Sequence, residues 1–117
     1  MSGADREVLW SAEELAMAAS GTVMAPFQVM GVSIDSRLVR PGDLFVAIVG
    51  PNHDGHDHVA DALARGASGA LVHRQPKGLG DNAPLVQVRD TLDALRAMAQ
   101  AARRRGSARV VAVTGSV

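Results

Sequence analysis

The densest group of chemically active side chains lies between residues 52 and 58, in the sequence Asn-His-Asp-Gly-His-Asp-His. Imidazole and carboxylate groups are good ligands for zinc and similar ions, so a metal site is one interpretation of this segment. The spacing argues against it. Two residues separate His53 from His56 and one separates His56 from His58, which matches no standard helical or knuckle arrangement. We therefore predict no metal site here.

The competing interpretation places the same segment at the start of a helix. Asp54 or Asp57 is suited to cap that helix, and the free backbone amides of its first turn, together with the helix dipole, attract an anion. Phosphate is the commonest such ligand, and His56 could add a hydrogen-bond donor. The segment therefore predicts a phosphate site.

A second polar cluster, Ser33-Ile-Asp-Ser-Arg37, follows an apolar stretch that predicts a strand. Side chains alternate along a strand, so Ser33 and Asp35 should share one side, with Arg37 on the same side if the strand continues. A carboxylate, two hydroxyls and a guanidinium can hydrogen-bond to a uracil edge, a ribose or a phosphate. From the residues alone, a structural ion pair between Asp35 and Arg37 is the favoured alternative.

The third feature is the C-terminal strand, in which Val110 to Val113 run into Thr114-Gly115-Ser116. A buried strand that breaks into Thr-Gly-Ser is how a phosphate-binding loop begins. The decisive Gly-Lys-Ser/Thr of such a loop is not within the 117 residues. Both a phosphate loop and an ordinary tight turn fit these residues.

The elements that position these clusters follow from periodicity, capping and turn residues. Ser11 and Glu14 form a capping box, and Gly21 is a suitable residue to end the helix that follows. Helices are expected over residues 12–20, 57–65 and 91–105. Strands are expected over residues 28–35, 44–50, 70–72, 85–88 and 109–113, the second of them buried on both faces. Alternating helices and strands place the chain in the α/β class.

Composition narrows the classes of partner. Hydrophobic residues make up 47% of the chain, and twelve basic residues balance twelve acidic ones, which gives no reason to expect a nucleic acid or an anionic membrane as partner. There is no cysteine, so disulfides and thiolate chemistry are excluded. No apolar run approaches the roughly 20 residues that cross a bilayer, and the polar N-terminus does not resemble a signal peptide, so we expect a cytoplasmic protein without membrane insertion.

The order of the clusters resembles the start of the Mur ligases. The matching segments are residues 33–37 (SIDSR), 41–47 (PGDLFVA), 54–57 (DGHD) and 111–116 (VAVTGS). They are most similar to the type that adds D-alanyl-D-alanine to UDP-MurNAc-tripeptide. The type that adds the third amino acid earlier in the pathway shares the DSR motif, but the DGHD segment and Ser116-Val117 favour the former.

The resemblance implies a small mixed-sheet domain flanked by helices. Residues 1–107 would bind the UDP end of the substrate, and residues 108–117 would begin an ATP-binding central domain. The residues that match the uridine-side motif are Ser33, Asp35, Ser36 and Arg37, and those that match the segment near the nucleotide are Asp54, Gly55, His56 and Asp57. Thr114, Gly115 and Ser116 match the opening of the ATP loop. His53 and His58 stand where phenylalanine is common.

The resemblance also implies the chemistry of the whole ligase. ATP, with Mg²⁺, would phosphorylate the terminal carboxylate of UDP-MurNAc-tripeptide, and the amino group of D-alanyl-D-alanine would displace the phosphate. No catalytic residue is assigned within these 117 residues, which are expected to be inactive and free of cofactor by themselves. A free-standing nucleotide- or phosphate-binding module is the alternative from a different class.

Overall fold

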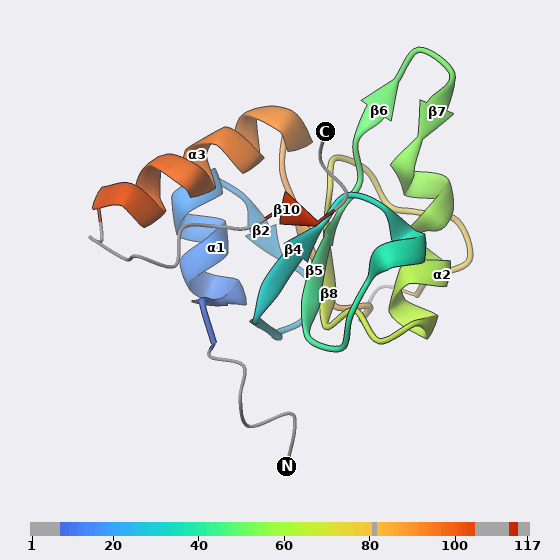
Figure 1. The fold of residues 1–117 in the computed structure, drawn as a ribbon, viewed down its shortest axis with the longest axis horizontal. Coiled ribbons are helices and arrows are strands. Elements are labelled where there is room, and N and C mark those ends of the chain that lie inside the picture. The colour runs from blue at the N-terminus through green and yellow to red at the C-terminus, as the bar shows by residue number, and fades with distance from the viewer. Residues whose placement is uncertain (1–7, 81, 105–112, 115–117) are drawn as a thin grey trace.

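The computed structural model describes residues 8–80, 82–104 and 113–114. At its centre is a six-stranded sheet in the order β10-β4-β5-β8-β9-β2 (Figure 1). Its strands are β2 (Thr22–Val23), β4 (Gly31–Ser33), β5 (Asp43–Val46), β8 (Gly69–Val72), β9 (Leu85–Gln87) and β10 (Val113–Thr114). All neighbours are parallel except β2, which pairs antiparallel with β9. The predicted mixed α/β sheet is confirmed.

Among the described residues, three α-helices cover the two faces of this sheet: α1 (Ala12–Ala19), α2 (Val59–Ala64) and α3 (Thr91–Arg104). Helices α1 and α3 lie together on one face and α2 on the other (Figure 1). The central strand β5 serves both faces, because Leu44 and Val46 belong to the core under α1 and α3 while Phe45 belongs to the core under α2. The expected strand with two buried faces is therefore confirmed over Asp43–Val46.

Helix α1 begins as predicted, since Glu14 N–H donates to Ser11 Oγ and the Ser11 amide donates to Glu14 Oε1. Its end differs from the prediction. Ser20, and not Gly21, adopts the left-handed conformation, with φ of 57°. A glycine is needed at position 21 for a different reason, which is lack of space. A Cβ on Gly21 would lie 2.8 Å from a methyl group of Val86 and from one of Val88.

Several predicted elements are shorter than expected. The strand expected over residues 28–35 divides into β3 (Gln28–Val29), which pairs with β1 (Trp10–Ser11), and β4. The strand expected over residues 44–50 leaves the sheet after Val46, and the chain then forms a hairpin of β6 (Val49–Gly50) and β7 (His53–Asp54). The helix expected over residues 57–65 is a 3-10 turn, Gly55–His58, followed by α2. In the last two cases the polar residues at 51–58 account for the difference, because they form the hairpin turn and the 3-10 turn.

The C-terminal strand is described only at Val113 and Thr114, which pair in parallel with Val32 and Ser33 of β4. These two residues thus extend the same sheet that carries residues 31–33, and a domain boundary after residue 107 stays a prediction. Within the described part of the chain, no helix is both long and apolar enough to cross a membrane.

Helix α3 is tied to the end of β5 by one buried hydrogen bond. Thr91 Oγ1 donates to the Ala47 carbonyl over 2.7 Å, and Thr91 is buried. Replacing Thr91 by the isosteric valine is expected to lower the free energy of unfolding by about 1–3 kcal/mol, because the buried carbonyl loses this donor. Urea unfolding measures the change. Thr22→Val, at an exposed strand position, is the matched control and should change stability by less than about 0.5 kcal/mol; equal effects of the two substitutions would contradict the assignment.

Candidate functional site

The parallel strands end at one edge of the sheet, and each of the polar clusters follows one of these ends. The Asp35–Arg37 segment follows β4, the β6–β7 hairpin follows β5, and His73 follows β8. In open sheets of parallel strands, ligands bind in the crevice outside the carboxyl ends of the strands. Because β4 and β5 are neighbours, the two motifs that lie about twenty residues apart in sequence meet in space.

The strand β4 stops at Ser33, so the expected alternation of Ser33, Asp35 and Arg37 along one strand side is wrong. Ser33 is buried, and its Oγ donates to the Asp35 carbonyl and accepts from the Asp35 amide. Residues Ser36–Leu38 form a 3-10 turn capped by Asp35. The Ser33 hydroxyl thus shapes the turn, while Ser36 and Arg37 line a cleft.

Asp35 and Arg37 form the ion pair that the residue types favoured. Arg37 donates through Nε to Asp35 Oδ1 over 3.1 Å and through Nη2 to Oδ2 over 2.8 Å. These hydrogen bonds to Arg37 lower the pKa of Asp35 from 3.8 to about 2. The Arg37 side chain is nevertheless 79% exposed, so the carboxylate orients a guanidinium that still faces solvent.

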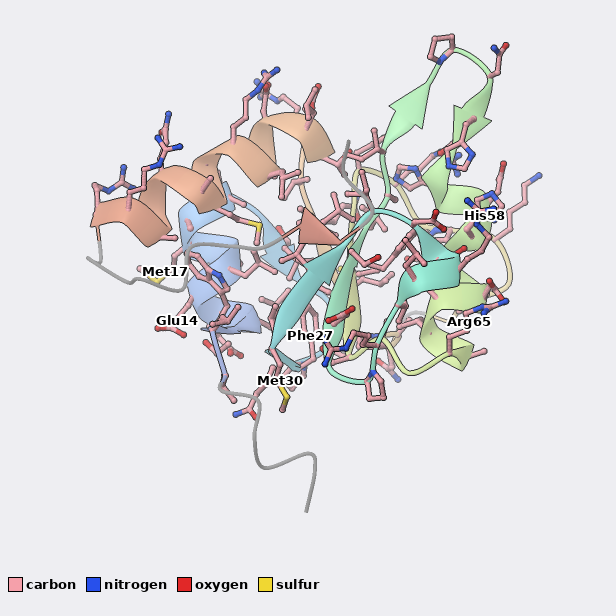
Figure 2. All side chains as sticks on the ribbon, viewed as in Figure 1. Glu14, Met17, Phe27, Met30, His58 and Arg65 are labelled. Carbon is pink, nitrogen blue, oxygen red and sulfur yellow. The ribbon has the colours of Figure 1, made fainter. Side chains whose placement is uncertain are left out.

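The cleft beside this ion pair has a volume of about 520 Å³. Its lining residues come from the turn after β4, the hairpin, the 3-10 turn and α2: Ile34, Asp35, Ser36, Arg37, His53, His58 and Asp61. The rings of His53 and His58 stack with centroids 5.0 Å apart and planes inclined by 12°. Figure 2 shows His58 on the side of the molecule that α2 forms, where Arg65 pairs with Asp61.

Both histidines and Asp61 were absent from the predicted site. The stacked geometry of the two histidines is a ring-on-ring contact of the kind that two aromatic side chains can share, and a replacement of phenylalanine at both positions stays a prediction from the resemblance. Only the pairing of β4 with β5 brings these residues to Asp35 and Arg37. In near-parallel rings the nitrogen lone pairs do not converge on one point, and the described residues contain no group of three or more side chains that could hold a metal ion.

The Asp54–Asp57 segment is arranged differently from the predicted anion site. Asp54 caps the 3-10 turn by accepting from the His56 amide over 2.9 Å, so a carboxylate already takes the amide that was expected to meet phosphate. The turn is continuous with a helix of only six residues, α2. Asp57 is exposed and is not among the residues that line the cleft.

His56 also has a different environment from the expected one. Its side chain is 0% exposed, its Nδ1 lies 2.7 Å from Asp54 Oδ1, and its Nε2 accepts the amide of His73 over 3.0 Å. The ring therefore has no nitrogen left to donate to a ligand. Arg74 donates to the second oxygen of Asp54 and completes the cluster.

His73 and Arg74 are further residues that the sequence did not connect with this segment. They lie 17 and 20 positions from His56 and Asp54, just after β8, and no motif marks them. The rings of His56 and His73 meet edge to face with centroids 4.2 Å apart. Of the predicted ATP-loop residues, Thr114 is placed beside Ser33 by its backbone, and Gly115 and Ser116 lie outside the described residues.

Comparison with known proteins identifies the family. The model described as "Mur ligase family, catalytic domain" matches residues 28–103, more than half of the chain. The chain is 33% identical over 110 residues to UDP-N-acetylmuramoyl-tripeptide–D-alanyl-D-alanine ligase of Rickettsia prowazekii, covering 94% of this chain and 24% of the relative. It is 40% identical over 92 residues to UDP-N-acetylmuramoyl-L-alanyl-D-glutamate–2,6-diaminopimelate ligase of Rhizobium meliloti, covering 79% of this chain and 19% of the relative.

Solved structures agree with these relatives. A crystal structure of MurF from Acinetobacter baumannii superposes with a TM-score of 0.72 at 30% identity, covering 89% of this chain and 23% of that one. The MurF ligase of Thermotoga maritima, in complex with ADP, gives a TM-score of 0.54 at 28% identity, covering 63% of this chain and 17% of that one. The chain thus spans about a quarter or less of the length of these relatives. Because the family model matches more than half of the chain and a relative at 33% identity matches 94% of it, this chain belongs to the Mur ligase family.

Proposed function

We propose that this chain is the part of an ATP-dependent ligase that binds the UDP end of UDP-MurNAc-tripeptide, to which the whole protein adds D-alanyl-D-alanine in peptidoglycan synthesis. The observation that carries the proposal is the cleft of about 520 Å³ at the carboxyl edge of the sheet, where the turn after β4 faces the hairpin after β5. A relative that matches 94% of this chain carries the name of this activity, and a solved structure that resembles the chain is a MurF.

The chemistry of the cleft suits a nucleotide. A guanidinium has five N–H donors, and the Asp35 carboxylate takes only part of them, so Arg37 retains donors for a phosphate or a uracil carbonyl. Ser36 adds a hydroxyl, and the stacked imidazoles of His53 and His58 offer an aromatic wall beside it. In this proposal Ser36, Arg37, His53 and His58 contact the ligand, whereas the side chains of Ser33, Asp54 and His56 shape the loops around it.

The remaining parts of the proposal concern the whole protein. ATP and Mg²⁺ are its cofactors, Thr114, Gly115 and Ser116 open the loop that binds ATP, and the reaction proceeds through an acyl phosphate of the tripeptide. The ADP complex of the Thermotoga maritima MurF ligase supports the proposal that the whole protein uses ATP. Its partners are the three small substrates, without nucleic acid or membrane insertion, and it works in the cytoplasm, where these substrates are found.

The substitution Arg37→Ala tests whether the cleft between the turn after β4 and the β6–β7 hairpin, which we call the nucleotide cleft, binds UDP. In the full-length protein that carries this sequence, UDP affinity measured by calorimetry should fall at least about tenfold, because the ligand loses a charge-assisted hydrogen bond. Arg96→Ala is the matched control, since Arg96 is also exposed and also pairs with a carboxylate, Asp93, but lies on α3 outside the cleft. Absence of UDP binding by the unaltered protein, or equal affinities of both variants, would refute the proposal.

The second candidate is the ligase that adds the third amino acid, favoured by the 40% identity to the diaminopimelate ligase of Rhizobium meliloti. That match covers less of this chain than the match to the D-alanyl-D-alanine ligase. Phosphate release by the full-length protein distinguishes the two. We expect phosphate release with UDP-MurNAc-tripeptide and D-alanyl-D-alanine. Phosphate release only with UDP-N-acetylmuramoyl-L-alanyl-D-glutamate and diaminopimelate would identify the protein as the second candidate. A free-standing nucleotide-binding module would release phosphate with neither pair.

A further inference from the structure

The buried imidazole of His56 joins the root of the β6–β7 hairpin to the end of β8. Its Nδ1 faces Asp54, the last residue of the hairpin, and its Nε2 accepts the amide of His73, just after β8. Arg74 adds a second link to Asp54, but its side chain is half-exposed, whereas the His56 ring is fully enclosed. The contact of His56 with His73 is therefore made inside the protein, where an alternative water partner is excluded.

These partners determine the protonation state of the ring. An amide N–H can only donate, so Nε2 must carry a lone pair toward His73. Nδ1 must then carry the proton that Asp54 accepts. A second proton on Nε2 would point at the N–H of His73, and two donors would face each other. The buried contact between the hairpin and β8 thus exists only with a neutral ring.

The hairpin that this contact holds separates two hollows at the carboxyl edge. On one side His53 lines the nucleotide cleft. On the other side Ile48 and Val49 line a second hollow of about 350 Å³, together with His73. A shift of the hairpin root would move His53 away from Arg37 and change both hollows together.

We propose that His56 is a positioning residue for the nucleotide cleft: its neutral ring latches the β6–β7 hairpin to the end of β8, and its protonation releases the hairpin and weakens nucleotide binding. The ligand part of this inference rests on the proposed function, while the latch itself does not. His56 does not contact the nucleotide; it acts through the placement of the β6–β7 hairpin, which forms one wall of the cleft.

The electrostatic surroundings of the ring are consistent with a neutral latch at neutral pH. Burial lowers the pKa of His56 below its usual 6.5, the hydrogen bond and charge of Asp54 oppose this, and the charges of His73 and Arg74 add to the lowering. Because the folded protein binds this proton less readily than the unfolded chain, the contribution of His56 to stability is complete above pH 6.5. It is lost as the pH falls through the lowered value.

The first experiment observes the latch directly. Nitrogen NMR of the full-length protein, with His56 assigned by its loss in His56→Gln, should show Nδ1 protonated and Nε2 bare at pH 7.5. As the pH is lowered, protonation of Nε2 and a change of the His73 amide resonance should follow the same titration curve. A protonated Nε2 at pH 7.5, or a His73 amide that does not respond when the ring becomes charged, would overturn the latch.

The second experiment measures its consequence for binding. We use UDP-MurNAc, since its diphosphate lacks the ionisation near pH 6 of a terminal phosphate. Between pH 7.5 and the pH at which NMR shows about nine-tenths of His56 charged, its affinity should fall about tenfold, because roughly one molecule in ten then keeps the latched state. His56→Gln keeps an acceptor for the His73 amide and a donor for Asp54 but cannot titrate, so it should bind as the unaltered protein does at pH 7.5 and show no such fall. His56→Leu, which lacks the acceptor, should bind weakly at both pH values.

The cleft itself contains two other imidazoles, whose effect on binding needs a control. His53 and His58 line it, so both are changed to glutamine, and the two pH profiles are repeated with and without His56→Gln in that background. The difference that His56→Gln makes should persist. If the unaltered protein binds UDP-MurNAc at no pH, the proposed function fails. If it binds equally at both pH values while NMR shows His56 becoming charged, the positioning role of His56 fails and the proposed function stands.

Discussion

Gly55→Ala is expected to lower the free energy of unfolding by about 2 kcal/mol, an overpacking cost that falls on the backbone. A Cβ on Gly55 would lie 2.8 Å from the Ile48 amide nitrogen and 2.9 Å from Ala47 Cα. Neither atom belongs to a flexible side chain, so the hairpin root has to move as a unit. The bond from the Gly55 amide to the Ile48 carbonyl, now 2.9 Å, would lengthen with it. UDP affinity should fall as well, because His53 moves with the root.

Gly50→Ala is the matched control for this prediction. Gly50 lies in the same hairpin, and a Cβ there would meet only the His53 carbonyl at 3.8 Å, an ordinary contact. Its loss of stability should stay below about 1 kcal/mol, since an alanine in a strand costs little beyond propensity. Chemical denaturation and calorimetry with UDP measure both variants. Should Gly50→Ala prove as damaging as Gly55→Ala, the close approach at Gly55 would not be the cause.

Asp54→Ala should cost about 2 kcal/mol at pH 7, because its carboxylate accepts three charge-assisted or backbone hydrogen bonds at once and two of them are shielded from water. The donors are the His56 amide, His56 Nδ1 and Arg74. Removing the acceptor leaves the enclosed Nδ1–H of His56 without a partner. The result is a loss both of stability and of the ring orientation that accepts the His73 amide.

Asp57→Ala controls for the loss of a negative charge in the same turn, since Asp57 is exposed, and its effect should be within about 0.5 kcal/mol. The pH dependence provides a second check. The hydrogen bonds, led by that from the His56 amide, lower the pKa of Asp54 below 3.8, so its stabilising contribution is present above that value and is lost as the pH falls through the lowered one. The difference between the unaltered protein and Asp54→Ala should therefore shrink in acid; a difference independent of pH would contradict an ionic role for Asp54.

Features determined by neighbouring residues could be predicted from the sequence. The capping box of Ser11 and Glu14 needs only a spacing of three and is present. The continuous apolar run from Leu44 predicted a strand buried on both faces, and the two cores on either side of β5 confirm it. The ion pair of Asp35 and Arg37 is equally local, because the partners are only two positions apart.

Features that depend on contacts between distant segments could not be predicted. The continuous apolar run extended the predicted strand to residue 50, but the turn at Pro51 and Asn52 folds Val49 and Gly50 back onto His53 and Asp54. The role of His56 depends on its contact with His73, and that of Asp54 on its contact with Arg74; both contacts form because β8 pairs with β5. The residue types at 54–57 indicated an anion site. In the structure, Asp54 and His56 instead bond to Arg74 and His73, which lie 20 and 17 positions away, and so stabilise the fold.

The short loop of the β6–β7 hairpin has a consequence for how such proteins can diverge. Pro51 and Asn52 form its exposed tip, while Asp54, Gly55 and His56 fix its root. Insertions are tolerated at exposed tips far more readily than at packed positions. Related sequences can therefore lengthen or alter this wall of the cleft beside Asp35 and Arg37 by changes at the tip, while the residues at the root stay the same.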